Sequence, residues 1–141
     1  MQLILRQPAA VDTGDESTGV VVAASPDTFG REQWQWDVRL AESAGRYVVT
    51  VSRNAKTIDV IEERIDIANA YEATRSVNEL WLAVVLDHPV THGGFLLEPG
   101  DVAVWEGDDP TSLSIRAVAN NASLHVVRIT RRDGKAARWV P

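Results

Sequence analysis

The chain has 141 residues, of which 45% are hydrophobic and 24% charged, and it carries a formal net charge of -6 without any cysteine. This composition is that of one folded domain, and it excludes a disordered chain, disulfide bonds and thiolate chemistry. The negative charge argues against nucleic acid or an anionic membrane surface as a partner, since both attract positively charged proteins. No apolar run approaches the length of a membrane span or a signal-peptide core, so we expect a single cytoplasmic domain over residues 1–141.

Short β-like segments separated by turn residues run along the whole chain, a pattern typical of sandwiches and barrels. The predicted strands are 2–6, 19–24, 35–41, 46–52, 57–62, 80–86, 95–97, 102–105, 112–117, 124–129 and 138–140. The last of them would close a final hairpin around Asp133 and Gly134. The spacing therefore predicts an all-β fold.

Residues 58–77 fit two kinds of secondary structure, because the isoleucines of this segment fall at both helical and strand spacing. The β-branched residues are concentrated before Asn69, which favours strands, whereas several alanines and glutamates favour a helix. We expect strands through about Ala70. A short helix from there toward Val77 is the alternative.

The segment 95–110 contains the most specific local signal. Two short alternating runs are joined by Pro99, Gly100 and Asp101, and such a turn is how small β-barrels change direction. Proline fixes its own φ angle, and the glycine after it can adopt the positive φ that a tight corner needs. We therefore predict a positive φ at Gly100.

Two tryptophans near the N-terminal third are candidate ligand-binding residues. Trp34 and Trp36 stand two residues apart, so a strand places both on one face with Val38 and Leu40. We interpret that face as core, and an aromatic wall of a ligand pocket is the alternative. On the opposite face, Arg39 belongs to a polar row that either faces solvent or lines a pocket, so it is a further candidate.

His88 and His92 are four residues apart, a spacing that puts two imidazoles on one helix face in zinc sites. Pro89 and the glycines 93 and 94 indicate a loop instead, so we expect no metal there. We interpret both as exposed turn histidines, and contact with a small anionic ligand or a subunit is the alternative. The chain contains no nucleophile elbow, phosphate loop or dinucleotide motif, so no catalytic residue and no cofactor are predicted.

The charge is unevenly distributed along the chain. From residue 128 onward there are five basic residues against one acid: Arg128, Arg131, Arg132, Lys135 and Arg138 against Asp133. We interpret this tail as solvated, and the alternative is a subunit contact onto an acidic patch of Glu106, Asp108 and Asp109. Small barrels leave strand edges that need cover, so we expect a homodimer.

Three segments carry a family resemblance: 80–86 (LWLAVVL), 95–110 (FLLEPGDVAVWEGDDP) and 124–129 (LHVVRI). Together they resemble cupin-like barrels, and they are most similar to the HutD/Ves family, small bacterial proteins associated with histidine degradation. The resemblance implies a double-stranded β-helix, or jelly-roll, barrel. It also implies a small-ligand-binding or regulatory accessory role in bacterial metabolism.

The chain departs from this family at its ligand site. Asp37 and Arg39 stand where the family has an arginine and a serine. Asp108, Asp109 and Pro110 stand where a metal-binding cupin would have its last histidine. The family's ligand residues are therefore not carried over, and the protein is expected to be free of metal.

The sequence thus predicts a metal-free cupin-like barrel with at most one short helix, which acts as a small-ligand-binding or regulatory accessory protein and has a small anionic metabolite as its candidate ligand. Two alternatives remain open. The first is a cupin-type enzyme such as a sugar isomerase or epimerase, which would need His88, His92 or His125 to meet a carboxylate. The second is a purely structural oligomeric barrel. A deep pocket with convergent polar groups favours binding or catalysis, and a filled barrel favours the structural role.

Overall fold

The computed structural model describes residues 1–4, 19–25 and 35–139. These ranges contain strands and no helix, so the predicted all-β class is confirmed. The strands are β1 (Gln2–Ile4), β2 (Val20–Ala24), β3 (Trp36–Ser43), β4 (Arg46–Arg53), β5 (Ile58–Ile67), β6 (Ala70–Thr74), β7 (Leu80–Val85), β8 (Val90–His92), β9 (Phe95–Leu97), β10 (Val102–Trp105), β11 (Ser112–Ala117) and β12 (Ala122–Arg131). None of the described ranges holds a helix that could cross a membrane.

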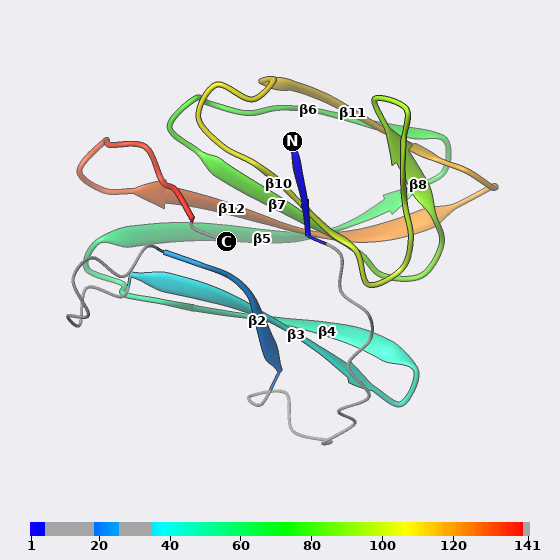
Figure 1. Ribbon diagram of the computed structural model, residues 1–141, viewed down its shortest axis with the longest axis horizontal. Coiled ribbons are helices and arrows are strands. Elements are labelled where there is room, and N and C mark those ends of the chain that lie inside the picture. The colour runs from blue at the N-terminus through cyan, green and yellow to red at the C-terminus, as the bar shows by residue number, and fades with distance from the viewer. Residues whose placement is uncertain (5–18, 26–34, 140–141) are drawn as a thin grey trace.

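The strands form three antiparallel sheets that are stacked as layers (Figure 1). Sheet A has the order β1-β10-β7-β12-β5, sheet B has the order β2-β3-β4, and sheet C has the order β6-β11-β8-β9. Sheet A is the middle layer, since its side chains pack into one core with sheet B and into another with sheet C. A third sheet was not predicted from the sequence.

The strands β10, β7 and β12 of sheet A are buried on both faces because their successive residues point to different neighbouring sheets. In β7, Leu80, Leu82 and Val84 belong to the core shared with sheet B, whereas Trp81, Ala83 and Val85 belong to the core shared with sheet C. The same division holds in β10 and β12. The uninterrupted apolar run of β7 therefore reflects burial on two sides rather than one.

Aliphatic and aromatic side chains fill the space between sheets A and C. Four rings follow one another across it. The ring of Tyr71 stacks on Trp81 with centroids 6.3 Å apart, Trp81 meets Trp105 edge-on at 5.2 Å, and Trp105 meets His92 edge-on at 5.2 Å. The part of the molecule that would be the interior of a barrel is thus a packed core.

Sheet B buries the predicted face of its central strand. Trp36, Val38 and Leu40 of β3 are at most 7% exposed and pack against sheet A, as the alternation of this segment predicted. Trp34 lies outside the described residues.

The segment 58–77 consists of two strands, β5 and β6, which turn at residues 68–69. The preference for strands is therefore confirmed, and the alternative of a short helix toward Val77 is wrong. β5 extends to Ile67, five residues beyond the end of the predicted strand 57–62, because every one of its residues pairs with β12. Long antiparallel pairing outweighs the helix propensity of Glu62 and Glu63.

Two other predictions differ from the structure. β8 was interpreted as a loop, but its three residues pair with β9 on one side, and Val90 and Thr91 also pair with β11 on the other. The second difference concerns the predicted last strand, 138–140, whose described residues 138 and 139 are not in a strand. That segment is held instead by hydrogen bonds from the Ala137 amide to the Asn78 carbonyl and from the Trp139 amide to Glu106 Oε2, at 3.1 and 3.0 Å.

The corner after β9 has the predicted conformation, since Gly100 has a φ of 89°. Asp101 closes the corner in both directions. Its amide donates to the Glu98 carbonyl at 2.9 Å, and its Oδ2 accepts from the Glu98 amide at 2.8 Å. The Gly100 amide donates to the Val85 carbonyl at 2.8 Å, which fixes the corner against the end of β7.

Candidate functional site

The residues singled out from the sequence lie in different parts of the fold. Trp36 is 1% exposed in the core between sheets A and B, and Arg39 lies on the other face of β3, where its Nε is 3.6 Å from Asp37 Oδ1. His92 faces Trp105 on the side of sheet C, and His88 lies in the turn after β7. These four side chains do not share a cleft.

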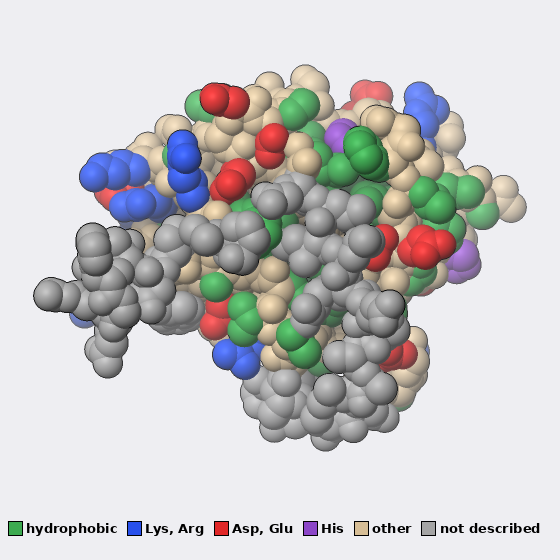
Figure 2. Space-filling model, viewed as in Figure 1, with side chains coloured by type: hydrophobic (Ala, Val, Ile, Leu, Met, Phe, Trp, Pro, Cys, Tyr) green, Lys and Arg blue, Asp and Glu red, His purple; other side chains and the backbone are tan. Residues whose placement is uncertain are grey.

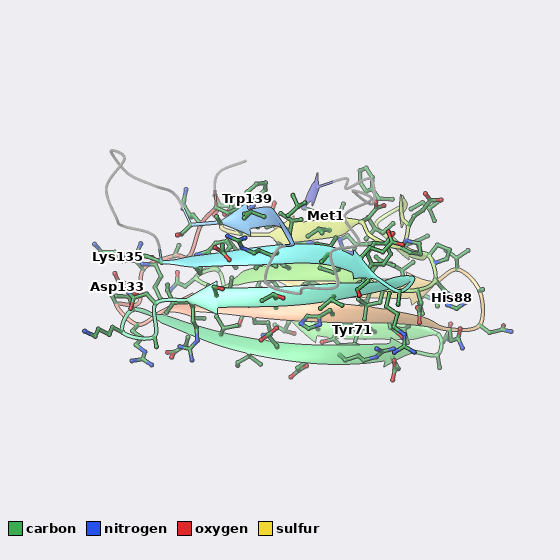
Figure 3. All side chains as sticks on the ribbon, turned by 90° about the horizontal axis from the view of Figure 1, so that it is seen from below. Met1, Tyr71, His88, Asp133, Lys135 and Trp139 are labelled. Atoms are coloured by element: carbon green, nitrogen blue, oxygen red, sulfur yellow. The ribbon has the colours of Figure 1, made fainter. Side chains whose placement is uncertain are left out.

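A hollow of about 340 Å³ opens between the β3–β4 hairpin and one end of sheet A. Its lining residues are Gly45, Arg46, Tyr47, Arg64, Leu86 and Asp87. We call it the arginine cleft. It lies at the end of the molecule where Figure 3 labels His88, the neighbour of Asp87 in the chain.

The β3–β4 hairpin determines where the first three lining residues stand. Ala44 and Gly45 both have positive φ, 52° and 75°, as in the two-residue turns that match the twist of antiparallel strands. Ser43 and Arg46 close the pairing directly at the turn. Arg46 and Tyr47 therefore begin β4 at the tip of sheet B, above the end of sheet A.

Tyr47 rests on the glycine corner. A β-carbon built on Gly100 would lie 2.9 Å from both Cζ and Oη of Tyr47, so the ring is seated on the glycine backbone. Burial, followed by the charges of Glu42 and Asp101, raises the pKa of the Tyr47 phenol above its usual value. The hydroxyl is therefore a neutral hydrogen-bond donor at physiological pH.

Asp87 is fixed by main-chain donors. Its Oδ1 accepts hydrogen bonds from the His88 amide at 2.7 Å and from the Ser123 amide at 2.8 Å. Burial opposes the ionisation of Asp87, but these hydrogen bonds outweigh it and hold the pKa of the carboxyl below its usual value. Asp87 is thus an ionised carboxylate whose Oδ1 is held by two main-chain amides, and its side chain is 42% exposed.

Arg64 contacts Ser123 and Asp66 through its guanidinium group. Its Nη2 donates to Ser123 Oγ at 3.4 Å, and its Nε lies 3.5 Å from Asp66 Oδ1, which in turn accepts from Ser123 Oγ at 2.8 Å. Arg46, in contrast, makes no salt bridge with any residue that the structure describes. Two arginines from different sheets thus line one cleft, and arginine is the residue type best suited to bind carboxylate or phosphate oxygens.

A histidine and a carboxylate meet close to this cleft. His125 of β12 is the cross-strand partner of Arg64, and its Nε2 lies 3.0 Å from Glu62 Oε1. The enzyme alternative required a histidine to meet a carboxylate in this way, and the His125 side chain is 23% exposed. The pair could orient an imidazole for proton transfer.

A second polar cluster is structural. Arg75 is 1% exposed and donates to the carbonyls of four residues, which ties the β6–β7 connection to the β10–β11 loop. These acceptors are Ser76, Glu79, Gly107 and Asp109. The Glu79 carboxylate is 7% exposed, and its Oε2 accepts from Arg128 Nε and Nη2, both at 3.0 Å. This cluster holds loops together, and Arg75, Glu79 and Arg128 line none of the three hollows of this section.

The basic tail lies at the opposite end from the arginine cleft. Figure 2 shows basic side chains at the edge of the molecule where β12 ends, and Figure 3 places Asp133 and Lys135 far from His88. A hollow of about 320 Å³ there is lined in part by Arg131 and Arg132. Both are paired within the chain, Arg131 with Asp133 and Arg132 with Asp59.

The residues of the predicted acidic patch line a different hollow. Glu106, Asp108 and Asp109 surround a space of about 490 Å³, together with Met1 and Arg138. Asp109 Oδ1 lies 2.9 Å from the Met1 ammonium group. The acids are therefore partly neutralised by groups of the same chain.

Within the described ranges, no three histidine or acidic side chains come close enough together to hold a metal ion. Comparisons with protein families, with curated proteins and with solved structures found no match for this chain. The candidate site therefore stands on its geometry alone.

Sequence reasoning missed Arg46, Arg64 and Asp87 because each looks like an ordinary surface charge. The turn sequence around Gly45 was a weak signal, since a tight hairpin there puts residue 46 at the sheet tip. Nothing in the spacing of the three residues indicates that sheet B would bring Arg46 onto the end of sheet A.

Proposed function

We propose that this chain is a small jelly-roll protein that binds a small organic anion in the arginine cleft. The observation that carries the proposal is the pair Arg46 and Arg64. Two arginines from separate sheets line one hollow, and Arg46 has no acidic partner within the described residues. A ligand carboxylate or phosphate would supply the missing counter-charge.

The strand order supports the jelly-roll part of the proposal. From β5 to β12, the first strand pairs with the last, the second with the second last, and so on inward to the β8–β9 hairpin. Two further pairings, β12 with β7 and β11 with β8, fold this nested hairpin into two four-stranded sheets. Such a wrapped hairpin is what a jelly roll of eight strands requires. Sheet B is then an addition to it.

The proposed binding site lies outside the interior of the barrel. The space between sheets A and C is filled, whereas the cleft opens beside the β3–β4 hairpin, at the end of the core between sheets A and B. Tyr47, whose neutral hydroxyl can donate a hydrogen bond, lines the cleft together with the two arginines. The volume of the cleft, about 340 Å³, is near the lower end of the range for ligand pockets, about 300–1,000 Å³, which favours a small metabolite.

The test is a binding screen with small carboxylates and phosphates, followed by protein NMR or calorimetry. We expect one or more of them to bind, and replacement of both arginines, Arg46→Gln with Arg64→Gln, to weaken binding by about a hundredfold or more. Arg116→Gln is the matched control, because Arg116 is exposed on β11 of sheet C, away from the cleft. Equal affinity in the double variant and the control would contradict the proposal.

A second candidate function is an enzyme that moves a proton on the bound anion, as a sugar isomerase or epimerase does. The observation that favours it is the pair of His125 and Glu62 beside Arg64. A histidine oriented by a carboxylate can act as a general base. Deuterium uptake from heavy water into a bound ligand, abolished in His125→Asn, would establish this function, and retained exchange in that variant would exclude His125 as the base.

A further inference from the structure

The arginine cleft holds charges of both signs that do not neutralise each other. Asp87 lines the same hollow as Arg46 and Arg64, yet neither arginine forms an ion pair with it within 4 Å. The salt bridge recorded for Asp87 joins its Oδ1 to His88 Nδ1, at 3.4 Å. Cationic and anionic residues therefore line one small space without pairing with each other.

The separation is built into the backbone. Asp87 cannot swing toward an arginine without losing the amide hydrogen bonds from His88 and Ser123. Both of those bonds fall on Oδ1, so Oδ2 receives neither. A carboxylate has about four acceptor positions, and Asp87 retains capacity for a donor from a ligand.

We infer that the ligand of the arginine cleft is a zwitterion of amino-acid size. Its carboxylate would meet Arg46 and Arg64, its ammonium group would meet Asp87, and its carbon skeleton would contact Leu86. This inference rests on the proposed anion-binding function and names the class of anion. A ligand with a carboxylate alone would leave the fixed negative charge of Asp87 facing it without compensation.

The experiment compares three acids of the same carbon skeleton that differ in one substituent. The probes are L-leucine, which has an ammonium group, 2-hydroxy-4-methylpentanoate, which has a hydroxyl, and 4-methylpentanoate, which has neither. We expect the unmodified protein to bind leucine about tenfold or more tighter than 4-methylpentanoate, with the hydroxy acid between them, because a charge-assisted hydrogen bond is stronger than a neutral one.

The variant Asp87→Asn isolates the charge. The asparagine oxygen can still accept the amides of His88 and Ser123, so the turn is retained, and a thermal unfolding curve verifies this. We expect Asp87→Asn to abolish the preference for leucine while binding of 4-methylpentanoate stays the same or improves. Arg46→Gln is expected to weaken all three acids together.

Two results would overturn the inference while leaving anion binding intact. One is equal affinity of the unmodified protein for leucine and 4-methylpentanoate. The other is an undiminished preference for leucine in Asp87→Asn. If none of the three acids binds the unmodified protein and the wider anion screen is also negative, the proposed function fails and the inference fails with it.

Discussion

Replacing Gly100 by alanine should destabilise the protein through two separable effects. The first is backbone strain, because Gly100 has a φ of 89°, where an L-residue costs about 1 kcal/mol or more. The second is a steric clash, because the new β-carbon would stand 2.9 Å from Cζ and Oη of Tyr47. Together we expect a loss of about 2–3 kcal/mol in the free energy of unfolding.

Gly94 offers a matched control for the first effect. Its φ is 83°, close to that of Gly100, but an added β-carbon would meet nothing within 4 Å. Gly94→Ala should therefore report backbone strain alone, about 1 kcal/mol. Urea unfolding of both variants measures the difference, and a double-mutant cycle of Gly100→Ala with Tyr47→Ala assigns that difference to the ring.

Equal losses in the two glycine variants would refute the reasoning about Tyr47. So would a Gly100→Ala loss that is unchanged in the Tyr47→Ala chain. The change also has a functional side, because Tyr47 lines the arginine cleft. If the ring moves to admit the methyl group, Gly100→Ala should weaken anion binding, whereas Gly94→Ala should not.

Three further outcomes are expected. Arg128→Met leaves the nearly buried Glu79 carboxylate without its partner, so it should lower the free energy of unfolding in urea by about 2–4 kcal/mol. Adding Glu79→Leu to the same chain should restore most of this loss. An unchanged free energy of unfolding in Arg128→Met would show that the pair is not buried in solution. The lowered pKa of Asp87 contributes stability that is complete above its unfolded value, about 3.9, and is lost as pH falls through the folded value. Acid unfolding should therefore flatten in Asp87→Asn, and an unchanged profile would contradict the assignment. The edge strand β9 exposes 58% of Phe95 and 52% of Leu96, so we expect this edge to form the contact of the predicted homodimer. Leu96→Lys should therefore lower the mass measured by light scattering toward that of a monomer. An unchanged dimer mass in this variant would exclude the β9 edge as the contact.

Local chemistry determined how much of the fold could be predicted. The bounds of β9, β10 and β11 were predicted correctly because glycine and proline stand beside them, at Gly94, Pro99 and Pro110. β8 was missed because it has only three residues between turn signals, and its pairing partners, not its composition, make it a strand. Short strands of this kind are decided by tertiary contacts.

The candidate site was harder to predict than the strands. Alternation in β3 showed that the face of the strand with Trp36 is buried, but it could not show that β3 would belong to a sheet separate from the one it packs against. Arg46, Arg64 and Asp87 come from three segments that the sequence treats independently. Their convergence depends on how sheet B lies on sheet A, and no periodicity in the chain encodes that packing.

The sharing of sheet A between two cores has a consequence for how the molecule opens. The strands β7 and β12 cannot expose one face to water without loosening the packing on the other, so neither core should persist when the other is lost. Amide protons at the centre of these strands should exchange with solvent only through global unfolding, whereas those of the peripheral strands β2 and β9 should exchange through smaller fluctuations. The two layers around sheet A would then behave as one cooperative unit, and a ligand bound in the arginine cleft would also slow exchange of those amides in sheet C that open only by global unfolding.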